Sequence, residues 1–286
     1  MITRGLEAAS RGMQSLIQYE DVIANNLANV NTTGFKRTSA AFKNVLDTQV
    51  TQKMSEPEKP GKIAGSVSLG NVLDRTYIDF NQGALNHTGS KLDVGIQGEG
   101  FFKMRLKDSL NEPDNREENY YYSRAGNFKL TIDSYLINNQ GDYVMDEQNR
   151  RIRLARNPED PEIDVNNRIQ LEKELLISED GLIQLVNQND TVTMQKIQIV
   201  DFQNKSLISS LGEGKFLPIK DTDPGRYVKN GGFSLQQGML EAANVSTVSE
   251  MIQSINVSRT YETLTKIVKT NGDTVSQAIE LGKIKG

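Results

Sequence analysis

The sequence predicts an α+β protein in which amphipathic helices at the two ends of the chain pair with each other and flank a central, mostly β domain. Apolar residues recur at spacings of three and four near the start of the chain and again after Gly238, which is the period of a helix facing a partner. Between the two ends, short alternating apolar stretches are separated by turn residues, as is typical of strands. We therefore expect residues 1–46 and 238–286 to form one helical domain with coiled-coil-like packing, residues 47–74 to be an extended linker, and residues 75–237 to be the β domain.

The first predicted helix carries a continuous apolar stripe that ends in turn-forming residues. The stripe consists of Leu6, Ala9, Met13, Leu16, Glu20, Ile23, Leu27 and Val30. Glu20 is its only charged member, and Ile17 widens it. Asn29, Asn31 and Gly34 then tolerate the left-handed backbone that closes a helix. A single helix of this kind is marginal in water, so we expect it to pack against a partner, either the core of its own domain or another helix.

After this helix the pattern changes twice before the β domain begins. Phe42, Val45 and Leu46 predict a short amphipathic continuation. The stretch Thr48–Gly65 is polar, contains prolines and shows no periodicity, so it is expected to be a linker.

The central domain shows the period of two that half-buried strands have. Leu92, Val94 and Ile96 alternate in this way, and Asp180-Gly181 is a good hairpin turn. The apolar positions change parity after Met194, which predicts a β-bulge. The spacing of the turns predicts a sandwich or an irregular barrel. Two charged stretches with prolines are expected to be surface loops, Lys107–Asn119 and Arg156–Arg168.

The C-terminal helix is predicted to carry two apolar stripes that do not share a register. The first stripe is Val245, Val248, Ile252 and Ile255, and the second is Val257, Tyr261, Leu264, Val268, Asn271, Val275 and Ala278. Ile255 and Val257 lie on opposite sides of a helix, so a single antiparallel partner cannot cover both stripes. Thr247 and Glu250 fit a capping box at the start of this helix.

Composition excludes several classes of function. The chain has no Cys, so disulfides and thiol sites are impossible. Its net charge is -4, and its Lys and Arg residues are scattered, which argues against nucleic acid as a partner. We find no apolar run near the ~20 residues that span a bilayer and no secretory signal, so we expect no membrane insertion and, from these features alone, a cytoplasmic protein.

The residues that could support catalysis or ligand binding lack the spacing or the partner residues that such sites require. His87, Ser90 and Asp93 are the types of a hydrolase triad, but they are too close together in a strand region and no nucleophile elbow accompanies them. The glycines at 95, 98 and 100 lack the Lys-Ser/Thr of a phosphate loop, and Asp221–Gly225 lacks most ligands of a calcium loop. We therefore predict no catalytic residue, no cofactor, no metal site and no enzyme activity.

Four stretches resemble, in the same order, the motifs of the axial proteins of the bacterial flagellar rod and hook. They are Ile23–Arg37, Thr88–Phe102, Ser123–Phe128, and Leu240–Val245 with Arg259–Glu262. The positions that match the motifs are Asn26, Asn29, Asn31, Gly34, Phe35, Leu92, Asp93, Gly98, Gly100, Phe101, Arg124 and Gly126. Because the matches cover both ends and the middle of the chain, the sequence is identified as similar to this family along its length.

The resemblance implies a structural subunit of the flagellar rod that polymerises helically through its terminal helices and transmits torque from the motor to the hook. It implies location in the periplasmic rod of the basal body, reached through the flagellar export channel without a cleaved signal peptide. The implied partners are copies of the chain and other rod and hook subunits, with surrounding ring or bushing proteins as candidates for contact with the two loops. The ending Val275–Lys285 favours the proximal-rod type over the distal type.

Residues of the two helices are the expected assembly interface. They are Leu6, Met13, Leu16, Ile23, Leu27, Val30, Val248, Ile252, Ile255, Val257, Tyr261, Leu264, Val268 and Val275. Two other interpretations of the helices fit the same pattern. One is a helical hairpin within a monomer, and the other is a soluble periplasmic or surface binding module that its terminal helices oligomerise.

Overall fold

The computed structural model describes residues 2–44, 48–51, 63–67, 71–109, 119–154, 173–186, 191–219, 226–227 and 232–283. The chain divides into two compact units. Unit 1 comprises Met1–Ala28, Thr38–Tyr77 and Ser246–Gly286, and unit 2 comprises Asn29–Arg37 and Ile78–Val245. Two long helices and a mostly β region confirm the predicted α+β class.

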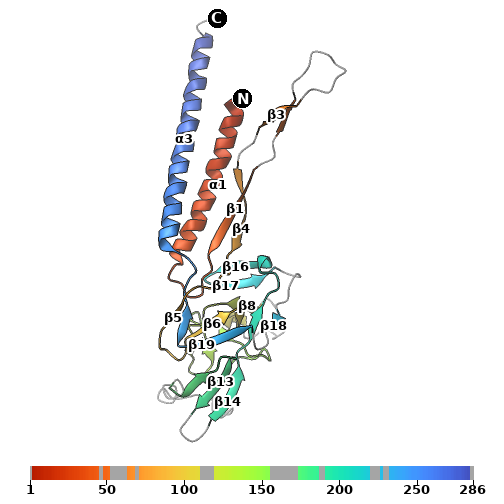
Figure 1. Cartoon of the computed structure of the whole chain (residues 1–286), viewed down its shortest axis with the longest axis vertical. Coiled ribbons are helices and arrows are strands. Elements are labelled where there is room, and N and C mark those ends of the chain that lie inside the picture. Colours follow the sequence, from red (N-terminus) through yellow and green to blue (C-terminus); the bar gives the residue numbers. More distant parts are fainter. Residues whose placement is uncertain are drawn as a thin grey trace. The chain divides into compact units, whose positions relative to one another are not determined.

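Two long helices run antiparallel in unit 1 (Figure 1). They are α1 (Ile2–Ala28) and α3 (Thr247–Lys283). The Tyr19 hydroxyl of α1 donates to Gln253 Oε1 of α3 at 2.6 Å. Gly12, which is earlier in α1, faces Leu264, which is later in α3, so the two helices run in opposite directions. A Cβ added at Gly12 would lie 3.4 Å from Leu264 Cδ1, so the two helices approach closely there. Each helix therefore supplies the partner that its amphipathic pattern requires.

Strands accompany the helices in unit 1. They are β1 (Thr38–Asn44), β2 (Thr48–Thr51), β3 (Ile63–Val67) and β4 (Asn71–Ile78). β1 pairs with β4, and β2 pairs with β3. α1 packs on the first pair, where the rings of Tyr19 and Phe42 meet edge to face with centroids 5.3 Å apart and the Ser15 hydroxyl donates to Asn71 O at 3.3 Å.

The predicted helical continuation at Phe42 is wrong, because Thr38–Asn44 is a strand. The reason is a side chain of the preceding helix. The Asn26 amide accepts from Thr38 N at 2.9 Å and donates to Thr38 O at 2.8 Å, as a neighbouring strand would. Val30 was expected in the helical stripe, but it follows the last residue of α1, in a turn. In the described parts of the expected linker, β2 and β3 form an antiparallel pair.

In its described residues, unit 2 contains short antiparallel strands and the 3-10 helices η1 and η3. Its strands are β5 (Leu85–His87), β6 (Val94–Gly98), β7 (Phe101–Arg105), β8 (Tyr120–Ser123), β9 (Lys129–Leu130), β10 (Leu136–Ile137), β11 (Tyr143–Val144), β12 (Leu175–Ile177), β13 (Leu182–Val186), β14 (Thr191–Lys196), β15 (Ile199–Asp201), β16 (Ile208–Gly212), β17 (Lys215–Pro218), β18 (Arg226–Tyr227), β19 (Phe233–Gln237) and β20 (Met239–Glu241). The 3-10 helices are η1 (Lys107–Ser109) and η3 (Lys205–Leu207).

The largest sheet of unit 2 has the strand order β16-β17-β8-β7-β11-β10-β9, and β15 pairs with both β7 and β18. Beside it lie the three-stranded sheet β12-β13-β14 and the pairs β6–β19 and β5–β20. The predicted bulge is confirmed in β14, because Leu182 pairs with Lys196 but Gln184 pairs with Thr193. Two residues of β14 therefore face one residue of β13.

Two apolar cores fill unit 2, and β7 contributes to both. Phe101 and Phe102 are consecutive and fully buried, so their side chains leave opposite faces of the strand. Phe102 belongs to the larger core, where it meets Phe128 edge to face. Phe101 belongs to a smaller aromatic core with Phe202 and Phe216. The double Phe of the motif is therefore a core-forming feature.

Some predictions fall outside the described residues. They concern Val45 and Leu46, the prolines of the linker, the loop Arg156–Arg168, the candidate calcium loop Asp221–Gly225 and most of the loop Lys107–Asn119, of which η1 and Asn119 are described.

Candidate assembly interface

Two motif residues of unit 2, Gly34 and Arg124, contact one buried residue, Glu241. Glu241 Oε1 accepts from Lys36 Nζ at 2.6 Å and from Gly83 N at 2.9 Å, and Oε2 accepts from Arg124 Nη1 at 3.3 Å. The Gly34 N–H donates to the backbone oxygen of Glu241 at 2.8 Å. We call Lys36, Gly83, Arg124 and Glu241 the Glu241 junction. It joins four segments that are far apart in the sequence.

The two cations of the Glu241 junction are held away from water. The side chains of Lys36, Arg124 and Glu241 are at most 2% exposed. Burial lowers the pKa of Lys36 from its ordinary value, and the attraction of Glu241 only partly offsets this. Burial lowers the pKa of Arg124 in the same way. Because an unpaired buried charge is costly, the junction depends on its single carboxylate.

Close approach of the backbone explains two glycines of the motifs. Gly34 has φ of 69°, and a Cβ there would lie 2.5 Å from Ala125 N. A Cβ at Gly126 would lie 1.8 Å from Val94 O. Any larger residue at either position would force the backbones of two motifs apart.

Asn244 makes a second contact between the start and the end of unit 2. Its Oδ1 accepts from Arg37 N at 2.6 Å. Its Nδ2 donates to the backbone oxygens of Asp79 and Asn81 at 2.8 and 2.9 Å. The chain enters and leaves unit 2 through adjoining segments, which the pattern of either segment alone could not predict.

The remaining motif residues of unit 2 are structural as well. Leu92 and Phe101 lie in the cores, and Asp93 accepts from the Thr88 hydroxyl at 2.7 Å. Gly98 O accepts from Arg124 Nη2 at 2.9 Å, and a Cβ at Gly100 would lie 2.4 Å from Ile199 Cγ2. Phe35 is buried, Asn29 O accepts from Thr32 N in the turn after α1, and Asn31 is exposed.

Asn26 is the motif residue that organises unit 1. Besides its two bonds to Thr38, its Nδ2 donates to Glu250 Oε2 at 3.2 Å. Glu250 is fully buried. One amide thus fixes β1 and the first turn of α3 against α1. The N-terminal cap of α3 differs from the predicted capping box. The hydroxyl of Ser246, which precedes Thr247, accepts from the first-turn Ser249 N at 3.5 Å.

The second predicted stripe of α3 faces α1. Val257 is 7% exposed, and Leu264, Val268 and Val275 are half-buried. On α1, Ile23 is buried, and Met13, Leu16 and Leu27 are half-buried. These residues therefore serve at least in part as an interface within the chain.

Three residues of the first predicted stripe lie on the opposite side of α3 and are uncovered, whereas Val245 precedes the helix and is half-buried. Val248, Ile252 and Ile255 are 68%, 54% and 51% exposed. Met251 is 48% exposed and lies on the same side of α3, three residues after Val248 and four before Ile255, although it is not part of the predicted stripe. We call Val248, Met251, Ile252 and Ile255 the bare face of α3. On α1, Leu6 and Ile17 are also exposed.

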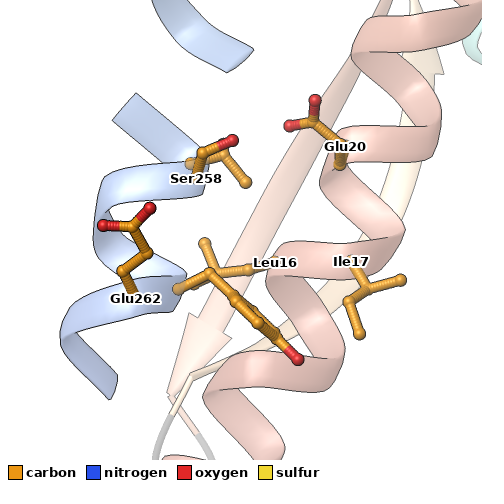
Figure 2. A pocket seen from close by; sticks show the side chains of 7 residues that line it. Leu16, Ile17, Glu20, Ser258 and Glu262 are labelled. Atoms are coloured by element: carbon orange, nitrogen blue, oxygen red, sulfur yellow. The ribbon is translucent and has the colours of Figure 1, made fainter. Parts of the chain in front are cut away.

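A hollow of about 300 Å³ lies between the two helices (Figure 2). We call it the α1–α3 groove. It is lined by Leu16, Ile17, Glu20, Val257, Ser258, Tyr261 and Glu262. Glu20 accepts from the Ser254 hydroxyl at 2.5 Å through Oε1, while its buried Oε2 has no hydrogen-bond partner among the described residues. The groove therefore combines apolar walls with two carboxylates, one from each helix.

Two further findings concern the described part of the chain. No group of three or more acidic or histidine side chains there could hold a metal ion. Neither of its long helices is apolar enough over a sufficient length to cross a membrane.

Three family models match the chain. Residues 6–36 match "Flagella basal body rod protein", residues 95–185 match "Flagellar hook protein FlgE/F/G D1 domain", and residues 236–281 match "Flagellar basal body rod FlgEFG protein C-terminal". The first match includes most of α1, the third includes most of α3, and the second lies within unit 2.

Full-length relatives carry the same description. The flagellar basal-body rod protein FlgG of Borreliella burgdorferi is 30% identical over 97% of this chain and 98% of its own length. FlgG of Caulobacter vibrioides is 30% identical over 93% of this chain and 95% of its own length, and FlgF of the same organism is 28% identical over 92% of each. These proteins are structural and not enzymes. The chain belongs to the family of flagellar basal-body rod proteins.

Proposed function

We propose that the chain is a structural subunit of the flagellar rod and that it polymerises through the helices of unit 1 to transmit torque from the motor to the hook. Its place is the periplasmic rod of the basal body, which it reaches through the flagellar export channel. Its partners are copies of itself and other rod and hook subunits. The helices pair in a coiled-coil-like manner, and the segments 107–119 and 156–168 contact a surrounding ring or bushing.

The bare face of α3 is the observation that carries this proposal. Four large apolar side chains, each at least 48% exposed, follow one another along one side of two helical turns. Contiguous exposed apolar surface of this kind marks an interaction site rather than ordinary surface. The partner helix α1 is on the other side of α3, where Val257 is buried, so a contact within unit 1 does not use this face.

Two aspartate substitutions separate assembly from folding. Ile252→Asp places a charge on the bare face and should abolish rod formation and swimming while leaving the helical content of the purified chain unchanged. Leu264→Asp places a charge against α1 and should lower the helical content as well, since an unpaired buried charge is strongly unfavourable. Each variant is expressed in a strain that lacks its own copy of this gene, and rods are counted in isolated basal bodies.

Thr260→Asp is the matched control, because it adds the same charge at an exposed polar position of α3. It should support rods and swimming as the unaltered chain does. The proposal fails if Ile252→Asp subunits build rods as efficiently as the control.

A further inference from the structure

We infer that the α1–α3 groove of one subunit receives the bare face of α3, together with Arg259, from a second copy of this chain. The inference rests on the proposed function and deepens it by naming the two surfaces that meet.

The groove offers an acidic surface with apolar walls. Glu20 and Glu262 line it from different helices, and Leu16 and Ile17 are apolar lining residues (Figure 2). Tyr261 adds to the apolar lining. Glu20 Oε2 is buried and lacks a hydrogen-bond partner among the described residues. A buried carboxylate oxygen in this state gains most from a charged donor. The groove therefore suits a cation on a long apolar stem.

The bare face of α3 continues into such cations. Arg259 follows Ile255 by four residues and Lys266 follows Arg259 by seven, so all three lie on one side of the helix. Arg259 and Lys266 are exposed, and neither forms an ion pair within the described chain. An arginine can lay its stem along apolar side chains while its guanidinium binds carboxylates.

The charges of the two helices are arranged oppositely. From Gly12 to the end of α1 at Ala28, the charged residues are Glu20 and Asp21, both acidic. The bare face of α3 is followed by Arg259 and Lys266, both basic. The two surfaces are therefore complementary in charge, and both carry exposed apolar residues such as Ile17 and Ile255.

The bare face and the α1–α3 groove are different surfaces of the same helix pair, so their contact between two copies is heterologous. Each copy presents its bare face to the groove of the next copy and its own groove to the bare face of the previous one. A contact of this kind leads to a ring or an open helical filament rather than a closed two-fold dimer. The geometry of unit 1 thus supplies the directionality that a helical polymer needs.

Charge reversal in separate chains tests the inference. Arg259→Glu makes the bare face acidic, and Glu262→Lys weakens the acidity of the groove. Both side chains are exposed, so neither change disturbs a buried contact. Each variant alone should fail to restore swimming in the deletion strain. Arg259→Glu places a carboxylate against Glu20 and Glu262, and Glu262→Lys places an ammonium group against Arg259. Co-expression of the two variants should restore swimming, because the two kinds of chain can alternate with matched contacts.

Cross-linking gives a direct second measurement, which is free of background because the chain has no Cys. Differently tagged chains carrying Ile17→Cys and Ile255→Cys should form a mixed disulfide in isolated basal bodies. Chains carrying Ile17→Cys and Ile267→Cys should not, because Ile267 is exposed on another side of α3.

The outcomes separate this inference from the proposed function. If the unaltered chain does not restore swimming, the proposed function itself fails. If it does, the inference is overturned when either charge variant works alone, when co-expression gives no rescue, or when rods form without the cross-link between positions 17 and 255.

Discussion

The carboxylate of Glu241 neutralises only part of the positive charge that surrounds it. Lys36 and Arg124 both donate to it, and all three side chains are almost fully buried. Burying ions costs several kcal/mol each, which hydrogen bonds and attraction to an opposite charge must offset. Glu241 exerts the largest attraction on both cations, ahead of Asp79 for Lys36 and Asp201 for Arg124. Glu241 lies near the end of unit 2, whereas the two cations come from its start and its middle.

Glu241→Gln should therefore destabilise unit 2 by about 3–5 kcal/mol, because it removes the carboxylate to which both buried cations donate. Urea-induced unfolding followed by circular dichroism measures the change. Glu213→Gln, at an exposed position, should shift the unfolding free energy by less than about 1 kcal/mol. Equal effects of the two variants would contradict the role assigned to Glu241.

A second polar network predicts the pH dependence of unit 2. Burial would raise the pKa of Asp142, but hydrogen bonds from Tyr121 and Lys215 lower it below its ordinary value of 3.8. The Tyr121 hydroxyl donates to Asp142 Oδ2 at 2.7 Å, and Asn138 Nδ2 donates to the Tyr121 hydroxyl at 2.7 Å. Because the folded state binds the Asp142 proton more weakly than the unfolded state, Asp142 stabilises unit 2 above its ordinary pKa and loses this contribution as the pH falls through the lowered pKa.

Asp142→Asn should thus lower the melting temperature near neutral pH. The melting temperature of the variant should also decrease less than that of the unaltered chain between about pH 5 and pH 2. Thermal melts across this range measure both effects, with Asp180→Asn at an exposed turn as the control. A variant that keeps the acid-dependent fall of the unaltered chain would show that another group is responsible.

At the level of single residues, the sequence identified important positions without identifying their partners. Gly34, Arg124 and Gly126 could be singled out from motif resemblance. That Gly34 and Arg124 both meet Glu241 could not, because the contact joins segments more than a hundred residues apart and leaves no periodic signal. Lys36 and Glu241 themselves lie within matching stretches, but only the structure shows them to be an ion pair.

At the level of elements, helical periodicity was the most informative signal. Periodicity is a local property, so the spacing of Val248, Ile255 and Val257 was enough to predict two stripes on opposite sides of α3. The exposure of Val248 and Ile255 and the burial of Val257 confirm this prediction. The strand β1 could not be predicted in the same way. Its backbone is held by the Asn26 side chain and by β4, and both contacts depend on the tertiary structure.

The division of the chain predicts where it can be cut. Residues 29–37 belong to unit 2, to which they contribute Gly34, Phe35 and Lys36. A fragment of residues 29–245 should therefore fold into a stable β unit. A fragment of residues 37–245 lacks Lys36 and the buried Phe35 ring, so it should be less stable by several kcal/mol. Urea unfolding of the two fragments measures the difference, and equal midpoints would contradict the assignment of residues 29–37 to unit 2.

At the level of the whole molecule, both ends of the chain take part in both units. Unit 1 contains α1 and α3, and unit 2 contains the segments that directly follow α1 and directly precede α3. Family membership favours the rod subunit over the alternative of a binding module with oligomerising helices. The preference for the proximal-rod type rests on the last residues of the chain and stays a prediction, since relatives named FlgG and FlgF both match along their length.

The accessibility of position 252 in free and assembled protein tests the central claim most directly. Ile252→Cys gives the chain its only thiol, on the bare face of α3, and a maleimide reagent reports whether that thiol is exposed. We predict rapid labelling of the free subunit and strong protection of the same position in isolated basal bodies, with Asp180→Cys labelled equally in both. Equal labelling of position 252 before and after assembly would contradict the claim that the bare face becomes buried when subunits join.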